Sequence, residues 1–306
     1  DNCTIDGCRI KIADGNDAAF INCVYGEGVV NPTIKNNFLN SSGAGGCGVH
    51  LRNTFNSTIT NNTIYGGKWS GGAGAGASAA DILFYSSVAS ARHVISGNYC
   101  LSNNSQGIFS DSLGRDAESI ITSNFCVTLD PATCIEGGAW SEIATGGIRR
   151  HGILIGYNDP VDETSSVIVS NNICKNTRWT GIYSQGTGTV PRKVIISNNI
   201  CVDNGFEAGN TLAGGIYLSK TGNEQVLGNT VHSFRGSAAS NVGAITINAA
   251  NATSLKTVIK DNRIVDSLSH GVSISTNSAG VVVDSNTITG SVFSDIYWSQ
   301  IQQIPL

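Results

Sequence analysis

Methionine is absent from the sequence, proline occurs only five times, and charged side chains are scarce. Asp, Glu, Lys and Arg make up 13% of the 306 residues, where an average soluble domain has about 25%. Disordered chains are rich in charge, and the exposed faces of helical proteins carry many Glu, Lys and Arg side chains. The scarcity of charge therefore argues against both a disordered chain and a helical protein.

Other absences exclude classes of partner. The net charge is −4, and no basic cluster exceeds the pair Arg149-Arg150, so we expect no nucleic-acid partner. No apolar run approaches the roughly 18 residues of a membrane span. The N-terminus carries neither a secretory signal nor an initiator methionine. We therefore expect a single domain over residues 1–306 that is a fragment of a longer chain.

Glycine is abundant, at 37 residues, and so are asparagine, serine and threonine. This composition favours many short strands joined by tight polar turns. A repeat supports that interpretation: an aliphatic residue, two residues, an Asn, one residue, and an aliphatic residue or Cys. Nine clean copies have their Asn at positions 37, 62, 98, 124, 172, 199, 229, 262 and 286. An imperfect first copy, Ile5-Cys8-Ile10, has Cys in the place of the Asn.

A second element follows the first in most copies: a Gly and an aliphatic residue that begin an alternating apolar-polar pattern. Gly107-Ile108 and Gly152-Ile153 are examples. Alternation with period two predicts strands, so each copy is a coil of two or three short strands. A single coil cannot bury its apolar face, whereas stacked coils can. Ten coils about 4.8 Å apart would form a rod roughly 45–50 Å long.

The aligned Asn of this repeat resembles the asparagine ladder of right-handed parallel β-helices, a fold shared by pectate lyases, polygalacturonases and many phage tailspikes. The predicted fold is therefore an all-β, right-handed parallel β-helix of about ten coils, most like a phage tailspike or polysaccharide depolymerase. The Asn amide can donate to and accept from the same position one coil away, and Asn tolerates left-handed backbone. The catalytic motifs of the pectate lyases and polygalacturonases are missing, so no catalytic residue is transferred from them.

Four of the nine cysteines, Cys100, Cys126, Cys174 and Cys201, occupy one position of four successive coils. Other coils have an aliphatic residue at this position. We expect buried, reduced thiols that pack as small hydrophobic groups, because side chains stacked in register suit disulfide geometry poorly. Metal-binding spacing of the CxxC type is absent.

Long connections near residues 65–80, 127–151 and 202–214 interrupt the coils and should lie at the same edge of the rod. Solenoids often carry their function where coils have insertions. Aromatic side chains in these connections either stack on sugar rings or fix the loops to the rod. The residues that we predict to bind substrate are Trp69, Trp140, Arg149, Arg150, Trp179, Tyr183 and Tyr217.

The candidate catalytic residues come from the long connection 127–151 and from the opposite edge of the rod. They are Glu136, Glu142, His151, Asp111 and Asp116. A glycosidase needs two carboxyl groups, whereas a lyase acting on uronic acids needs a cation and a base, and these residues suit either reaction. No metal or other cofactor is predicted, although grouped acidic residues also suit Ca²⁺ or ordinary turns.

Two apolar columns face outward over the middle coils. One contains Phe109, Leu154, Tyr183 and Tyr217, and the other contains Tyr99, Phe125, Ile173 and Ile200. Such stripes mark interfaces or surfaces beneath covering loops. One stripe could be the contact of a homotrimer, as in tailspikes, and the other could be a saccharide platform or be covered by the connection 127–151.

The resemblance implies a tailspike-like protein on the virion surface or outside the cell, which binds and cleaves a bacterial surface polysaccharide as a hydrolase or a lyase. The alternative is a non-catalytic β-helical adhesin or receptor-binding fibre module, because the fold alone requires no enzyme.

Overall fold

The computed structural model describes most of the chain, and its described residues form β-strands joined by turns. The described residues are 2–12, 21–41, 46–65, 80–86, 91–102, 106–113, 118–128, 151–156, 166–177, 179–186, 193–205, 214–219, 223–234, 242–248, 257–275 and 280–299. No helix in these ranges has the length and apolar character that crossing a bilayer requires.

The strands form three parallel sheets of ten strands each. The first sheet contains β1 (Cys3–Asp6), β4 (Pro32–Lys35), β7 (Ser57–Thr60), β10 (Arg92–Ser96), β13 (Glu118–Thr122), β16 (Ser166–Ser170), β19 (Lys193–Ser197), β22 (Glu224–Leu227), β25 (Thr257–Lys260) and β28 (Val281–Asp284). The second sheet contains β2 (Arg9–Lys11), β5 (Phe38–Asn40), β8 (Thr63–Tyr65), β11 (Tyr99–Ser102), β14 (Phe125–Thr128), β17 (Ile173–Lys175), β20 (Ile200–Val202), β23 (Thr230–His232), β26 (Arg263–Val265) and β29 (Thr287–Thr289). The third sheet contains β3 (Val24–Glu27), β6 (Val49–Arg52), β9 (Ala80–Ser86), β12 (Gln106–Leu113), β15 (His151–Ile155), β18 (Thr180–Gln185), β21 (Gly214–Ser219), β24 (Gly243–Asn248), β27 (His270–Ile274) and β30 (Ile296–Trp298).

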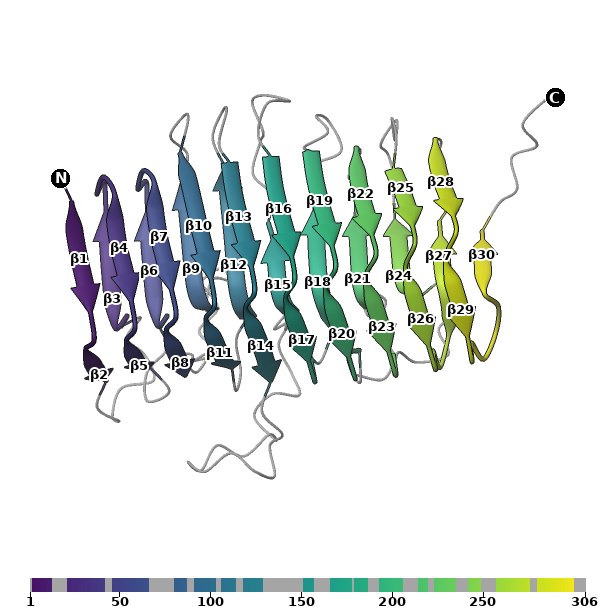
Figure 1. Cartoon of the computed structure of the whole chain (residues 1–306), viewed down its shortest axis with the longest axis horizontal. Coiled ribbons are helices and arrows are strands. Elements are labelled where there is room, and N and C mark those ends of the chain that lie inside the picture. The colour runs from purple at the N-terminus through teal and green to yellow at the C-terminus, as the bar shows by residue number, and fades with distance from the viewer. Residues whose placement is uncertain are drawn as a thin grey trace, which may run out of the picture.

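Each coil of the chain contributes one strand to each sheet, in the order first, second, third. Every strand pairs in parallel with the equivalent strand of the next coil, so the ten coils stack into a rod with β1 at one end and β30 at the other (Figure 1). The predicted parallel β-helix of about ten coils is confirmed.

The predicted asparagine ladder occupies the turn between the first and second sheets. The Oδ1 atom of Asn172 accepts hydrogen bonds from both the backbone N and the Nδ2 of Asn124, at 2.9 and 3.0 Å. The Nδ2 of Asn172 donates to Asn199 Oδ1 at 3.0 Å and to the carbonyl of Ile121 at 2.9 Å. Because the same pattern recurs from Asn37 to Asn286, the ladder satisfies buried polar groups in successive turns.

The ladder ends as the sequence predicts, since the backbone N of Cys8 in the first coil still donates to Asn37 Oδ1. We expected left-handed backbone at the ladder Asn itself, but it occurs at the residue before it. The residues directly before the ladder Asn have positive φ, for example Asn171 at 56° and Asn198 at 55°. The ladder Asn is therefore selected for its amide, and the preceding position for its tolerance of positive φ.

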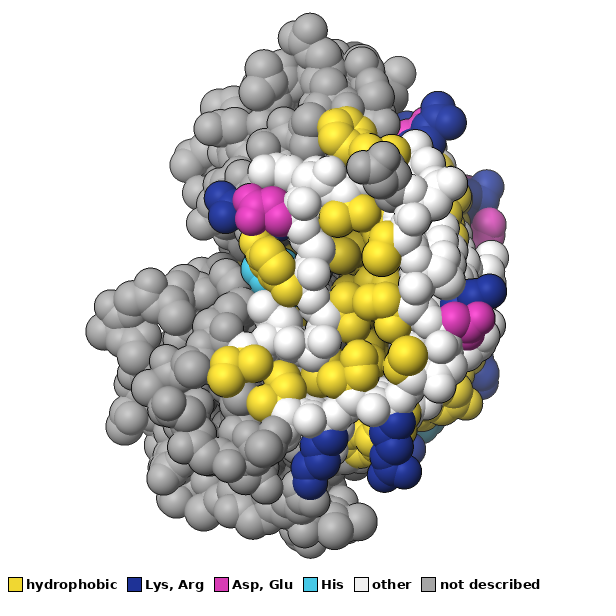
Figure 2. Space-filling view, turned by 90° about the vertical axis from the view of Figure 1, so that its left-hand side faces the viewer, with side chains coloured by type: hydrophobic (Ala, Val, Ile, Leu, Met, Phe, Trp, Pro, Cys, Tyr) yellow, Lys and Arg dark blue, Asp and Glu magenta, His cyan; other side chains and the backbone are white. Residues whose placement is uncertain are grey.

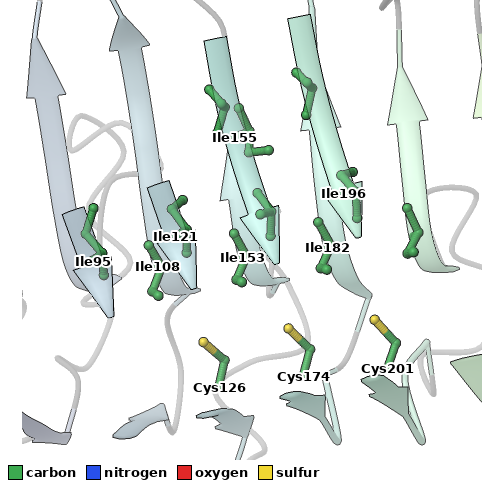
Figure 3. Packing of buried hydrophobic residues seen from close by; sticks show 14 of the residues in the cluster. Ile95, Ile108, Ile121, Cys126, Ile153, Ile155, Cys174, Ile182, Ile196 and Cys201 are labelled. Atoms are coloured by element: carbon green, nitrogen blue, oxygen red, sulfur yellow. The ribbon is translucent and has the colours of Figure 1, made fainter. Parts of the chain in front are cut away.

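The interior of the rod is one continuous apolar cluster of side chains from all three sheets. Cys100, Cys126, Cys174 and Cys201 are in register on β11, β14, β17 and β20. They are buried and free, which confirms the prediction of packed thiols. Figure 3 shows Cys126, Cys174 and Cys201 on neighbouring strands, beside the isoleucines of the core. Burial raises the pKa of the Cys100 thiol, which favours its neutral form.

Asp81 lies in a column of the third sheet that most coils fill with glycine. Ile82 pairs in register with Val49 and Ile108 of the flanking coils. The residues before these partners are Gly48 and Gly107, which are therefore the equivalents of Asp81. Further along, a Cβ on Gly152 would lie only 2.8 Å from Cys174 Sγ, so that position allows little more than a hydrogen atom. Asp81 is fully buried, and neither carboxyl oxygen has a hydrogen-bond partner among the described residues. Burial raises the pKa of Asp81 well above its usual value.

Among the described residues, no further coil stacks on either end of the rod. Figure 2 looks onto the end that carries β1, β2 and β3, where apolar side chains gather in the middle of the section. Ile5 and Ile10 of this first coil are only partly buried against the core. The end strands β1 and β30 each pair on one side only, so their other edges are unpaired within the described rod.

We predict that Asn172→Ala lowers the free energy of unfolding by about 3–5 kcal/mol, because it leaves at least two buried polar groups without partners. Asn286→Ala in the half-buried last coil should cost roughly 1 kcal/mol, since water can replace the lost partners there. Chemical denaturation of both variants measures the difference. Equal losses at the two positions would contradict the stabilising role of the buried ladder.

We also predict that Asp81 makes stability pH-dependent. Because its folded-state pKa is raised, the folded protein binds this proton more tightly than the unfolded chain does. The stability contribution is full below the unfolded pKa of about 3.9 and is lost as pH rises toward the folded pKa. Asp81→Asn should therefore gain stability over the wild type as pH increases from about 4. Thermal unfolding of both proteins across pH tests this expectation, and a difference in stability that does not change with pH would contradict it.

Candidate functional site

The outer face of the third sheet brings together more of the predicted site residues than any other described surface. Residues such as Ile153 and Ile155 point into the core, so the alternate residue Leu154 points outward. The outward residues form two columns across successive strands. The apolar column contains His50, Leu83, Phe109, Leu154, Tyr183 and Tyr217. The polar column contains Glu27, Arg52, Gly156, Gln185, Ser219 and Asn248. The backbones of Tyr85 and Asp111 hold the same register position on β9 and β12.

Four aromatic residues form a contact chain on this face, which we call the aromatic cluster: His151, Trp179, Tyr183 and Tyr217. The ring of His151 lies 4.7 Å from that of Tyr183 and 5.8 Å from that of Trp179, between centroids. Tyr183 and Tyr217 meet edge to face at 5.4 Å. Such geometries are favourable for aromatic pairs. Trp179 is half-buried, whereas the other three side chains are only 2% exposed.

Hydrogen bonds extend the aromatic cluster along the polar column. The Nδ2 of Asn248 donates to the hydroxyl of Tyr217 at 3.0 Å, and Ser275 Oγ donates to Asn248 Oδ1 at 3.2 Å. Burial raises the pKa of Tyr217, so its phenol remains protonated near neutral pH. The face therefore passes from aromatic to amide and hydroxyl groups across β18, β21, β24 and the end of β27.

Connections of different lengths join this sheet to the other two. Residues 66–79, 129–150 and 206–213 each connect a strand of the second sheet to one of the third, so their ends meet one edge of the third sheet. Residues 114–117 and 157–165 leave from its opposite edge toward the first sheet. The turns between the first and second sheets are the short ladder turns. Variation in length is therefore concentrated on both sides of the third sheet.

Four of the predicted site residues, His151, Trp179, Tyr183 and Tyr217, thus lie together in the aromatic cluster. Asp111 lies on β12 in the polar column, in register with Tyr85, and only its backbone is described. The roles assigned to these residues remain predictions. The other predicted residues lie outside the described ranges: Trp69, Asp116, Glu136, Trp140, Glu142, Arg149 and Arg150.

The two apolar stripes differ in exposure. The stripe on the third sheet, from Phe109 to Tyr217, is buried, with 8% of Phe109 and 2% of Tyr217 exposed, as expected for a covered surface. The stripe on the second sheet reaches solvent, since Tyr99 is 55% and Ile200 is 41% exposed. An open platform is therefore present on the second sheet and absent from the described part of the third.

A group that the sequence analysis missed lies at the β1 end of the same face. We call Tyr25, Glu27, His50 and Arg52 the N-terminal cluster. The Tyr25 hydroxyl donates to Glu27 Oε2 at 2.6 Å, and Arg52 Nη1 lies 3.6 Å from Glu27 Oε1. The rings of Tyr25 and His50 meet edge to face at 5.2 Å. Alignment of Val24-Tyr25-Gly26-Glu27 with Val49-His50-Leu51-Arg52 would have revealed the cluster, because both segments alternate in the same register.

The surroundings set the protonation of this cluster near neutral pH. The hydrogen bond to Glu27 raises the pKa of Tyr25, which keeps the phenol protonated. Burial and then the charge of Arg52 lower the pKa of His50, which keeps the imidazole neutral. The cluster thus holds a proton donor, a neutral base and a cation side by side. Among the described residues, no group of three or more His, Cys, Asp or Glu side chains could hold a metal ion.

Comparisons with known proteins place this geometry in a family. The family model described as "Right handed beta helix region" matches residues 147–300, about half of the chain. The chain belongs to this right-handed β-helix family. The match fixes the hand of the winding and confirms the fold expected from the Asn repeat. No relative was found among curated proteins.

Solved structures share the β-helix along nearly the whole chain. The Dettilon tailspike protein (gp208) aligns with a TM-score of 0.58 at 16% identity, over 97% of this chain and 61% of the tailspike chain. The A-module of the mannuronan C-5 epimerase AlgE4 from Azotobacter vinelandii aligns with a TM-score of 0.49 at 15% identity, over 96% of this chain and 78% of the module. At these identities the tailspike likeness shows a shared fold. The chain spans less than two thirds of the tailspike chain that it matches.

We predict that Tyr183→Ala destabilises the protein by about 3 kcal/mol or more, because it removes a buried ring from the aromatic cluster. Tyr183→Phe keeps the ring and should cost much less. Thermal or chemical unfolding of the pair measures the contribution. An unchanged stability in Tyr183→Ala would contradict the packing of this ring.

Proposed function

We propose that this β-helix protein binds and cleaves a bacterial surface polysaccharide, acting outside the cell or on a virion surface. The proposed binding surface is the half-buried part of the outer face of the third sheet, where Trp179, Gln185 and Asn248 reach solvent beside the covered rings of Tyr183 and Tyr217. A tailspike-like activity is the function that agrees best with the fold, the position of the long connections and the chemistry of this face.

The single observation that carries the proposal is the aromatic cluster joined to a line of amide and hydroxyl groups on a rigid sheet. Sugar rings present apolar C–H faces that pack on aromatic side chains, and hydroxyls that pair with amide and hydroxyl groups. Trp179 is the member of the cluster that reaches solvent, and Gln185 and Asn248 are half-buried in the neighbouring polar column. The parallel strands repeat this surface along the rod, which suits a long chain molecule.

The comparisons support the proposal at the level of the fold. A tailspike protein shares the stacked coils over 97% of this chain, and folds of this kind host many functions. In the same proposal the protein assembles as a homotrimer through the exposed stripe of Tyr99 and Ile200, to which Val94 and Ile120 of the first sheet add further exposed apolar surface.

We expect the protein to bind at least one member of a panel of capsular and O-antigen polysaccharides and to shorten it. Trp179→Ala should weaken binding at least about tenfold, which corresponds to about 1.4 kcal/mol, because a stacking surface is lost. The matched control is Trp298→Ala, since Trp298 is 41% exposed on the last strand, far from the aromatic cluster. Affinity is measured by calorimetry, and chain length by size-exclusion chromatography.

The outcomes separate the two classes of function. Binding without chain shortening supports the non-catalytic receptor-binding module in place of the enzyme. Absence of binding across the panel contradicts the proposal, and equal losses in the two Trp variants contradict the assignment of the surface.

A further inference from the structure

Exposed apolar side chains gather at the two ends of the rod. Among the described residues, most of the large hydrophobic side chains that are exposed lie in the first coil or in the last coil. Those of the first coil are Ile21, Tyr25 and Val30, and those of the last coil are Val282, Val292, Phe293, Ile296 and Trp298. Because apolar surface of this kind marks interaction sites, the end coils are candidate interfaces.

The last coil exposes side chains that point toward the interior of the rod. Ile296 and Trp298 are in register with Val272 and Ile274 of the preceding coil, and these two are fully buried in the core. Ile296 is nevertheless 42% exposed and Trp298 41% exposed, because no described coil packs on them. The last coil therefore presents an apolar interior surface at the β30 end.

The first coil presents the complementary surface at the β1 end. Ile5 and Ile10 are only partly buried against the core, and Figure 2 shows apolar side chains in the middle of this end of the rod. Gly26 on β3 takes the inward register position that Leu51 fills on β6. The first coil thus contributes no side chain at the position where the next coil has a leucine.

We propose that the last coil of one copy of this chain stacks on the first coil of a second copy, so that rods join end to end. The partner is argued from the chain itself, because each coil is already the binding partner of the next coil in all three sheets. The edge strands β1 and β30 each keep one unpaired side among the described residues, and such edges are templates for another strand. Only head-to-tail stacking keeps all strands parallel and each sheet continuous with its own kind.

The side chains of the two ends fit each other in this register. Each column of the third sheet runs from a residue of β3 to a residue of β30. Stacking continues the columns across the junction, and the facing pairs are Ile296 with Val24, Tyr297 with Tyr25, and Trp298 with Gly26. The largest side chain therefore meets the residue without one, which is the large-against-small arrangement that fills a core.

The same register also brings one unfavourable pair together. Asp284 of the last coil and Asp6 of the first coil are equivalent positions of the first sheet, since Asp284 pairs with Lys260 as Asp6 pairs with Lys35. Each carboxylate has its own lysine, at 3.2 and 3.3 Å, but the two carboxylates would be neighbours at the junction. Like charges on adjacent strands oppose pairing, so removal of one should strengthen the association.

The asparagine ladder is interrupted at the junction. Within the rod, the backbone N of each ladder Asn donates to the next ladder Asn, as Asn262 does to Asn286 Oδ1 at 2.9 Å. In the stack, the backbone N of Asn286 would face Cys8 of the second copy, whose sulfur is a weak acceptor. An Asn at position 8 would supply the missing amide oxygen.

This interface goes beyond the proposed function and does not depend on it. It is heterologous, because the two ends are different surfaces, so it forms open stacks with a distribution of lengths. A stack also continues the outer face of the third sheet from one copy to the next, which lengthens the surface that a polysaccharide chain could follow.

The test measures self-association of the 306-residue chain without any glycan, by sedimentation equilibrium and small-angle X-ray scattering over about 1–100 μM protein. We expect the longest dimension to grow with concentration in steps of roughly 45–50 Å per added rod. The cross-section of the particles should stay constant. A lateral trimer would instead enlarge the cross-section at constant length.

Variants of the two ends should change the association in opposite directions. Ile296→Lys should weaken it at least about thirtyfold, because a charge would be buried against Val24. Asp6→Asn should strengthen it about two- to fivefold, and Cys8→Asn should strengthen it by continuing the ladder. Gains in the last two variants cannot come from misfolding, which keeps the proposal testable if Ile296→Lys disturbs the last coil.

The matched control is Tyr99→Lys, which places the same charge on the exposed stripe of the second sheet, away from both ends. It should leave end-to-end association within about twofold of the wild type. A longest dimension that does not change with concentration would overturn the proposal, and so would growth of the cross-section alone. Equal association in wild type, Ile296→Lys and Asp6→Asn would overturn the assignment of the two end coils. Because no polysaccharide is present, these outcomes are independent of whether the protein binds or cleaves one.

Discussion

The register between coils depends on one interaction, the hydrogen-bonded column of Asn side chains between the first and second sheets. Each amide accepts from the coil before it and donates to the coil after it, at 2.9–3.0 Å for Asn172. An amide in the wrong register would leave several buried polar groups unpaired, which is costly in a low-dielectric interior. This column therefore keeps the coils in line even though 48 residues separate Asn124 from Asn172 and 27 separate Asn172 from Asn199.

Alignment at one corner leaves the other two corners free to vary. Connections into and out of the third sheet differ greatly in length, while the ladder turn keeps its form from coil to coil. The chain can thus add residues on both sides of the third sheet without disturbing core packing. Because parallel strands repeat the same outward positions, residues as distant as Tyr25, His151 and Tyr217 come to share one face.

The same alignment makes each core position sensitive to size. Glycine recurs at the start of the third-sheet strands because the core side chain of the following coil fills the space, as Cys174 does beside Gly152. Small, polarisable thiols suit such a column, and in-register strands keep them parallel and unpaired. Asp81 takes the place of one of these glycines and is a buried carboxyl without a described partner.

The sequence by itself determined the fold, because the Asn repeat, the Gly that starts most third-sheet strands and the alternating residues are local signals that recur in most coils. It also placed the thiols of Cys100 to Cys201 in the core, since their column is aliphatic elsewhere. Only the tertiary structure decided which outward columns are exposed: Tyr217 is buried and Tyr99 is not, although both lie in apolar stripes. Only the tertiary structure showed that Tyr25 and Glu27 of β3 lie beside His50 and Arg52 of β6, because neither strand carries a recognisable motif by itself. The chemistry of that cluster arises from the register between two strands, and register is a property of the stacked coils.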